Sequence, residues 1–121
     1  IHHGADVNRK AFDGSTAFHA AIGPGHINAA LKIMDAGGDP TTQDSVGLSP
    51  MMMICDKGDT DLFKIIFDKY PQSIRGKDKK GKECYNFALE KGHLEITSII
   101  NDDIMRQALP KHIKDRVMVK I

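Results

Sequence analysis

The sequence predicts an all-α fold in which short pairs of helices stack along one axis to form a solenoid. One stretch occurs three times: residues 14–26 read GSTAFHAAIGPGH, residues 47–59 read GLSPMMMICDKGD and residues 81–93 read GKECYNFALEKGH. The leading glycines lie 33 and then 34 residues apart, a period typical of stacked supersecondary units. Apolar residues follow each glycine at helical spacing, in segments too short to bury their own faces. Each pair must therefore pack on its neighbours.

The first helix of each pair follows a residue suited to a helix N-terminus. Thr16 and Ser49 can accept a backbone N–H there, and Pro50 fits the first helical position, where no donor is needed. The later glycine of each copy is expected to end this helix as a C-terminal cap. The apolar residues of these helices are Ala17, Phe18, Ala20 and Ala21, then Met51, Met52, Met53 and Ile54, and then Tyr85, Phe87, Ala88 and Leu89.

A second amphipathic helix is expected in each copy after the later glycine. In copy one it ends before the breaker Gly37–Pro40. In copy two it ends at Tyr70–Pro71, because proline cannot continue a helix. Its apolar residues are Ile27, Ala30, Leu31, Ile33 and Met34, then Leu62, Phe63, Ile65, Ile66 and Phe67, and then Leu94, Ile96, Ile99 and Ile100.

The 121 residues suit one domain, with 40% apolar and 27% charged residues as in ordinary globular proteins. The chain begins at Ile1 in the middle of a repeat period, so we expect a fragment. After Asn101 the repeat pattern stops, and Ile113, Val117 and Ile121 recur every four residues. This last segment is interpreted either as a helical cap on the third pair or as a linker to a further domain. The expected units are a partial repeat at 1–13, repeats at about 14–46, 47–80 and 81–100, and the cap or linker at 101–121.

The three copies resemble the ankyrin repeat. The family's helix-opening pattern T-P-L-H-x-A is matched by TAFHAA at Thr16–Ala21 and more loosely by SPMMMI at Ser49–Ile54. The Gly-His pair before the family's second helix occurs at Gly25–His26 and Gly92–His93, and the hairpin signature GADVN occurs at Gly4–Asn8. Copy three departs from the pattern, as is expected of a terminal, capping repeat. Its departures are Glu83, Cys84 and Asn86 in place of Thr, Pro and His.

The resemblance implies helix pairs joined by β-hairpin-like loops, and partner proteins that bind the hairpin tips and the exposed side of the first helices. Phe12 and Val46 are apolar in loops that are normally polar. We interpret them as anchors that flank a groove ending at the lysines of copy three; the alternative is that each packs against the adjacent hairpin. The candidate partner-binding residues are Phe12, Asp13 and Ser15 in copy one, Ser45, Val46, Leu48, Asp56 and Lys57 in copy two, and Lys79, Lys80 and Lys82 in copy three.

Charge is distributed unevenly along the chain, although the formal net charge is only +1. Residues 35–68 hold seven Asp and two Lys, a net charge of −5, whereas residues 75–82 hold five basic residues and one Asp, a net charge of +4. Residues 111–120 add a further +3. Such segments can orient a dipolar partner, or they are simply solvated loops. A third interpretation is a phosphate-binding patch for nucleic acid or anionic lipid, which the lack of interleaved aromatic residues disfavours.

The sequence contains no G-x-S-x-G, H-E-x-x-H or phosphate-binding G-x-x-x-x-G-K-S/T motif. For His19, His26 and His93 the resemblance implies hydrogen bonds to neighbouring backbone. His2 and His3 lack the nearby Cys or carboxylate ligands that a zinc ion needs. We therefore expect no enzyme activity, no cofactor and no metal.

Cys55 and Cys84 belong to no C-x-x-C motif, and the sequence has neither a signal peptide nor an apolar run long enough to span a membrane. We expect reduced thiols in a cytoplasmic or nuclear protein that does not insert into membranes and is a monomer. The function we expect is non-enzymatic protein–protein interaction, as a scaffold module within a larger protein. The alternative is the regulatory ankyrin arm of an enzyme or channel whose functional domain lies outside this sequence.

Overall fold

The structure, a computed structural model, describes residues 7–110. These residues form helices without any strand, which confirms the predicted all-α class for the described part of the chain. The predictions for residues 1–6 and 111–121 lie outside the described residues; they include His2, His3, most of the GADVN signature, the apolar repeat at Ile113, Val117 and Ile121, and the basic tail. The helices are α1 (Ala17–Ile22), α2 (Ile27–Asp35), α3 (Pro50–Lys57), α4 (Thr60–Lys69), the 3-10 helix η1 (Pro71–Ile74), α5 (Cys84–Glu90) and α6 (Leu94–Ala108).

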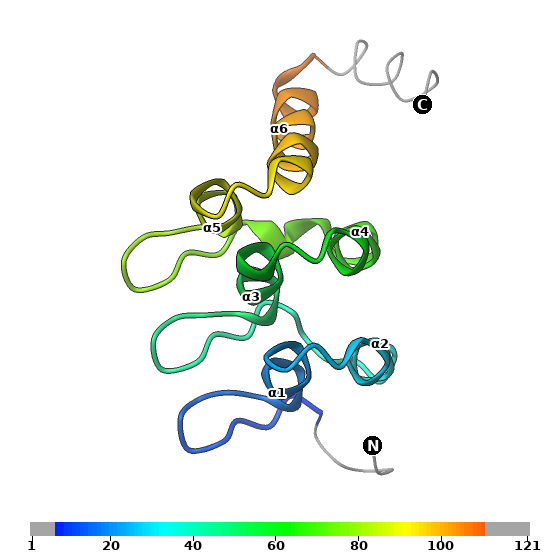
Figure 1. Ribbon diagram of the computed structural model, residues 1–121, viewed down its shortest axis with the longest axis vertical. Helices are drawn as coiled ribbons and strands as arrows, with labels where there is room; N and C mark the ends of the chain where they lie inside the picture. The colour runs from blue at the N-terminus through cyan, green and yellow to red at the C-terminus, as the bar shows by residue number, and fades with distance from the viewer. Residues whose placement is uncertain (1–6, 111–121) are drawn as a thin grey trace.

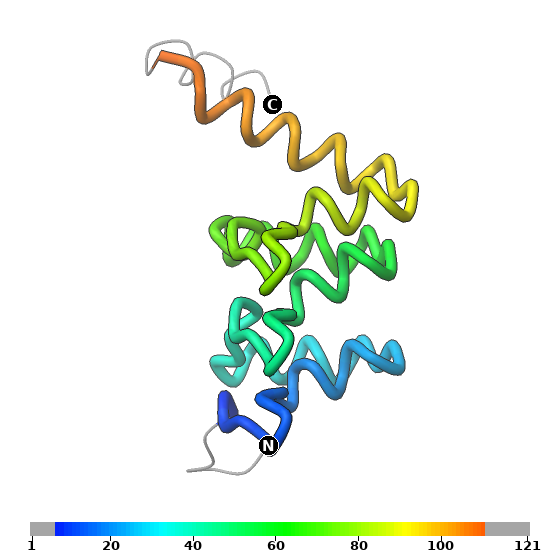
Figure 2. The backbone as a smooth tube through the Cα atoms, turned by 90° about the vertical axis from the view of Figure 1, so that its left-hand side faces the viewer, coloured from blue at the N-terminus to red at the C-terminus, as the bar shows by residue number. Residues whose placement is uncertain are grey.

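The α-helices form three consecutive pairs that follow one another along the long axis of the molecule (Figures 1 and 2). Within a pair, α1 packs on α2, α3 on α4 and α5 on α6. Between pairs, α3 contacts both α1 and α5, and α4 contacts α6. The loops that precede α1, α3 and α5 project from the same side, on the left in Figure 1, while α2 and α4 lie on the opposite side.

The first helices begin where the sequence predicts. Ser49 Oγ accepts the N–H of Met52 at 3.1 Å, and Pro50 is the first residue of α3. In copy one, His19 Nδ1 accepts the N–H of Thr16 at 3.0 Å. In copy three, where Asn stands in place of His, the side-chain oxygen makes the equivalent bond to the residue before the helix, at 2.8 Å. The Asn86 side chain therefore replaces the His19 ring as the acceptor at this position.

The helix ends agree with the prediction in one copy and differ in two. Gly58 caps α3 in the left-handed conformation, with φ of +81°. Gly25 and Gly92 also have positive φ, but they lie beyond the ends of α1 and α5, whose caps are Gly23 and Lys91. In both copies the cap residue has right-handed backbone, and the glycine with positive φ follows it one or two positions later.

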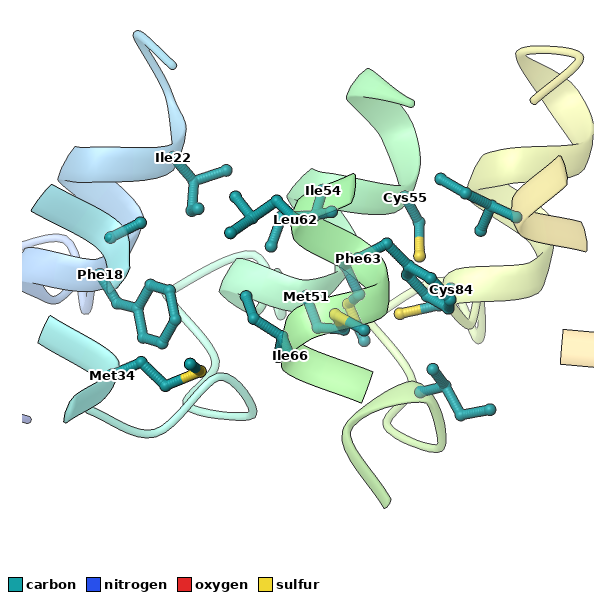
Figure 3. Close-up of a cluster of buried hydrophobic side chains, with 14 of the residues drawn as sticks. Phe18, Ile22, Met34, Met51, Ile54, Cys55, Leu62, Phe63, Ile66 and Cys84 are labelled. Carbon is teal, nitrogen blue, oxygen red and sulfur yellow. The ribbon is translucent and has the colours of Figure 1, made fainter. Parts of the chain in front are cut away.

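The core runs through all three pairs (Figure 3) and includes Phe18, Ile54 and Phe63. Cys55 on α3 and Cys84 at the start of α5 are both buried and free, and they meet between two repeats although they are 29 residues apart in sequence. Some residues of the expected apolar helix faces are instead exposed, because they lie on the outer sides of their helices. These are Ile27, Ile65, Leu89 and Leu94.

Helix α6 is longer than the other helices and continues without interruption through Ile100 and Asn101, where the third repeat was expected to end. Its inner face buries Ile96 and Ile100, while Ile104 and Met105 are exposed. The division of the chain into repeats and a terminal cap or linker stays a prediction.

Candidate protein-interaction surface

Three equivalent turns project from the first helices and carry most of the predicted partner-binding residues. Each turn contains a glycine with positive φ, Gly14 (+81°), Gly47 (+89°) or Gly81 (+83°). The N–H of each glycine donates to the carbonyl three residues earlier, at 2.9, 3.0 and 3.0 Å. A second bond closes each loop in the manner of a hairpin, at 2.7 to 2.9 Å. The three loops are therefore rigid, hydrogen-bonded turns rather than open loops.

Adjacent turns are bonded to each other along the stack. The N–H of Ser45 donates to the carbonyl of Asp13 at 2.9 Å, and the N–H of Lys79 lies 3.5 Å from the carbonyl of Val46. The backbones of Asp13, Ser45, Val46 and Lys79, four of the predicted partner-binding residues, therefore join adjacent turns. Their side chains are left to face solvent. All four side chains belong to exposed residues.

Two aspartates that sequence reasoning missed organise the second and third turns. The Oδ1 atoms of Asp44 and Asp78 each accept two backbone N–H groups from the following residues, an Asx-type arrangement. The bonds run from Val46 (3.0 Å) and Leu48 (2.9 Å) to Asp44, and from Lys80 (2.9 Å) and Lys82 (2.8 Å) to Asp78. The spacing D-x-x-G, present in both copies, is the signal that could have revealed this.

In the first turn Ala11 stands at the position of Asp44 and Asp78, and Asp13 provides the accepting carboxylate instead. The hydroxyl of Ser15 donates to Asp13 Oδ1 at 2.6 Å, and its N–H does so at 3.0 Å. These bonds hold the pKa of the Asp13 carboxyl below its ordinary value, because they favour the charged form. Asp13 and Ser15 thus have a local structural role.

Two adjoining hollows lie between the turns and the first helices, and together we call them the hairpin groove. One hollow has a volume of about 390 Å³ and the other about 320 Å³. Leu48 and Phe87 line both, so the two hollows lie side by side. The first is lined by Val46, Leu48, Asp78, Lys79, Lys80, Lys82 and Phe87, and the second by Gly23, Leu48, Met52, Met53, Asp56, Lys57 and Phe87.

The structure brings seven of the eleven candidate residues together and leaves four outside. Phe12 is fully exposed, at 110% of its reference area, so it does not pack against the adjacent hairpin, and it does not line the groove. Val46 is 56% exposed and does line it. The seven lining residues are Val46, Leu48, Asp56, Lys57, Lys79, Lys80 and Lys82, and the four outside are Phe12, Asp13, Ser15 and Ser45.

Sequence reasoning assigned Met53 and Phe87 to the helices and missed that they line the groove. Both occupy the same repeat position, the variable x of T-P-L-H-x-A, where copy one has Ala20. They are half-buried, with one side packed against the core and the other in the groove. A large apolar residue at a position that the pattern leaves variable is the signal that could have found them.

The lysines of copy three differ in their surroundings. Lys82 Nζ lies 2.8 Å from the carboxylate of Glu90 and 5.2 Å from the ring centre of Phe87. The Glu90 carboxylate raises the pKa of Lys82 above its ordinary value. Lys79 and Lys80 are exposed, and neither makes an ion pair within residues 7–110.

The histidines bond to backbone, as the family resemblance implies, in two of three cases. Because His19 Nδ1 accepts a hydrogen bond from the Thr16 N–H, the ring proton is on Nε2, which donates to the Leu48 carbonyl at 2.8 Å. His93 Nε2 lies 2.9 Å from the Asp56 carbonyl. The ring of His26 is exposed and makes no hydrogen bond to another described residue. The two bonded rings join neighbouring repeats just beneath the groove.

In the part of the chain that the structure describes, no three His, Cys, Asp or Glu side chains lie close enough together to hold a metal ion. Within residues 7–110 there is also no helix with the length and apolar character needed to cross a membrane.

Comparison with known proteins places short parts of the chain beside two kinds of larger protein. No family model matches the chain. It is 37% identical over 62 residues to "Potassium channel AKT1" of Oryza sativa subsp. indica, which is 51% of this chain and 7% of the channel. It is 44% identical over 50 residues to "Inactive serine/threonine-protein kinase TEX14" of Bos taurus, or 41% of this chain and 3% of that protein, and 40% identical over 50 residues to TEX14 of Mus musculus.

The chain therefore spans only 3 to 7% of the length of these curated relatives. One relative is a channel and the other is a kinase described as inactive, so neither name assigns a catalytic activity to the matched part. The partial matches and the stacked helix pairs agree with a helical repeat module of the kind that occurs within larger proteins.

Proposed function

We propose that this chain is an ankyrin-type solenoid that recognises a partner protein through the hairpin groove and the turns beside it. The ankyrin assignment is supported by three motif copies in register and by helix pairs whose turns project from one side. The observation that carries the function is the groove itself. It keeps apolar side chains partly open to solvent between rigid elements, beside lysines without ion pairs, and such a surface is typical of a protein-binding site.

A comparison of two variants with the parent chain in a pull-down from cell lysate tests this. The first variant, Phe12→Ala, Val46→Ala and Lys80→Glu, changes one residue in each of the turns that precede α1, α3 and α5. We call this surface the turn face and this chain the turn-face variant. The matched control, Ile27→Ala, Ile65→Ala and Lys32→Glu, makes the same kinds of change at exposed positions of α2 and α4. All three chains should show the same circular dichroism.

We expect a set of proteins that the parent and the control retain and the turn-face variant loses. Equal retention by all three chains would contradict recognition through this face. Loss in the control alone would move the binding site to α2 and α4.

The second candidate function is a regulatory arm whose partner is another domain of the same protein. The similarity to a channel and to an inactive kinase, each far longer than this chain, favours it. Cross-linking of the intact protein distinguishes the two, because a regulatory arm would give cross-links from Lys79 and Lys80 to another domain of its own chain. A scaffold would give such cross-links to a different protein. The cytoplasmic or nuclear location and the monomeric state stay predictions, which fluorescence microscopy and sedimentation velocity measure.

A further inference from the structure

We infer that the hairpin groove binds a linear segment of a partner protein in which an apolar side chain is followed, on one side, by acidic residues. The apolar side chain would occupy the groove beside Met53 and Phe87, and the acidic residues would meet Lys79 and Lys80. The inference rests on the proposed function and specifies the chemistry and polarity of the partner.

The apolar part of the segment follows from the floor of the groove. Leu48, Met53 and Phe87 pack against the core with part of their surface and line the groove with the remainder. They come from two neighbouring repeats that the hydrogen bond between His93 and the Asp56 carbonyl joins, so the floor is preorganised. A flexible thioether next to a rigid ring adapts to apolar side chains of different shapes.

The acidic part of the segment follows from which charges are already satisfied. Lys82 is held by Glu90, and Asp78 directs Oδ1 to two backbone N–H groups of its own turn rather than to a lysine side chain. Lys79 and Lys80 are left with exposed ammonium groups that have no carboxylate partner among residues 7–110. Carboxylates of a bound segment would complete these pairs.

The direction of the segment follows from the other end of the groove, where Lys57 is the one lining lysine without an ion pair among residues 7–110. Asp56 lies there beside Lys57, and its carboxylate is 3.9 Å from Lys91 Nζ. The turn end therefore offers two lysines without an ion pair, and the end near the helix C-termini offers one. A segment with its acidic residues on the side of Lys79 and Lys80 would meet the greater number of such lysines.

The size and charge of the groove favour a peptide over a nucleic acid. Three lysines without an ion pair among residues 7–110, Lys57, Lys79 and Lys80, line it, and three phosphate contacts give a salt dependence with a slope of about 3 in a log–log plot, below that of typical DNA-binding proteins. The ring of Phe87 has Lys82 over its face, which hinders the stacking of a base on that face.

The test is a selection of short random peptides displayed on phage against the 121-residue chain and two variants. The charge-reversal variant is Lys79→Glu with Lys80→Glu, at side chains that make no bond within the described residues. The matched control is Lys32→Glu with Lys69→Glu, which changes the net charge equally on α2 and α4.

We expect the parent and the control to enrich peptides with one apolar residue and an acidic flank. The reversal variant should enrich the same apolar residue with a basic flank, because only the charge at the turn end has changed. Enrichment of the same peptides by all three chains would overturn the inference, as would enrichment without an apolar residue. A parent that enriches no peptide overturns it too.

Binding of one selected peptide, measured by fluorescence anisotropy, gives a second readout. Met53→Ala should weaken binding about tenfold or more, as truncation of an anchor contact does. Charge reversal should weaken binding at low salt and have much less effect at high salt, because the lysines are exposed. A short DNA duplex that binds more tightly than the peptide, with a steep salt dependence, would replace the inference with nucleic-acid binding.

These outcomes are separable from those of the lysate experiment. Suppose that the turn-face variant loses proteins in the lysate pull-down, but that charge reversal leaves the residues beside the apolar anchor unchanged in the peptide selection. The module would then recognise proteins through this face by another chemistry. If neither experiment depends on the face, the proposed function fails as well.

Discussion

At the scale of single residues, two glycines with the same backbone conformation have very different surroundings. A Cβ on Gly47 would lie 2.7 Å from the N atom of Lys79 and 2.9 Å from the Cα of Asp78, in the next turn of the stack. A Cβ on Gly81 would meet no atom within 4 Å. Gly47 is therefore required both for its positive φ and for the close approach of the next turn, whereas Gly81 is required for φ alone.

We accordingly expect Gly81→Ala to lower the free energy of unfolding by about 1–2 kcal/mol, the cost of a left-handed non-glycine residue. Gly47→Ala should cost clearly more, because backbone atoms of the third turn must also move. Urea unfolding followed by circular dichroism measures both. Equal losses for the two variants would show that contact between turns does not constrain this position.

The two thiols give a prediction for pH. Hydrogen bonding to the Cys84 thiol and burial raise the pKa of Cys55. A raised pKa in the folded state stabilises the protein fully below the pKa of the unfolded thiol, about 8.5, and this contribution is lost as the pH rises above that value. The stability difference between the parent and Cys55→Ala, measured by urea unfolding, should therefore shrink between about pH 7.5 and 9.5. A constant difference would contradict the shift.

At the scale of helices, the start of α3 depends on one side chain. Ser49 is buried and its Oγ holds the Met52 N–H, which otherwise has no partner inside the helix. Ser49→Ala should lower the free energy of unfolding by about 1 kcal/mol, the usual value of an N-terminal cap.

Ser98→Ala on the exposed side of α6 is the control for this prediction, and it should be neutral or slightly stabilising, because Ala favours helices. Thermal or urea unfolding measures both variants. A Ser49→Ala variant as stable as the control would show that water or a shifted helix start replaces the cap.

At the scale of the whole molecule, the middle pair supports both of its neighbours. Phe63 on α4 is fully buried, and its ring stacks on that of Phe67 at 5.5 Å. Phe63→Ala should lower the free energy of unfolding by about 3–5 kcal/mol, because it removes a large core side chain and leaves a cavity. Ile65→Ala, on the exposed side of the same helix, should change stability by only about 0.5 kcal/mol.

Helix α4 packs on α3, and α3 contacts both α1 and α5. The loss of the Phe63 ring should therefore lower the stability of all three pairs together. Hydrogen exchange of the amides in α1, α3 and α5 tests this coupling. Faster exchange confined to α3 and α4 would show that the pairs unfold independently.

Local patterns sufficed to predict the helix class and the N-terminal residues of α1 and α3, because capping, glycine conformation and helical spacing act over a few residues of chain; the partner-binding role of the seven candidate residues that line the groove stays a prediction. They did not suffice for Phe12, which is as apolar as Val46 in sequence but stands outside the groove. Nor did they reveal Asp44 and Asp78, whose effect appears once the turn geometry is known.

What the sequence by itself determined about this protein is the repeat period, the helix pairs and the places where their turns project. Only the tertiary structure decided that Cys55 meets Cys84, that Met53 and Phe87 line one groove, and that Glu90 neutralises Lys82 while Lys79 and Lys80 keep unpaired charges. The physical reason is distance along the chain. Capping and helix formation join near neighbours, whereas these contacts join residues of different repeats, or a turn to the far end of the helix that follows it, and they exist only in the folded chain.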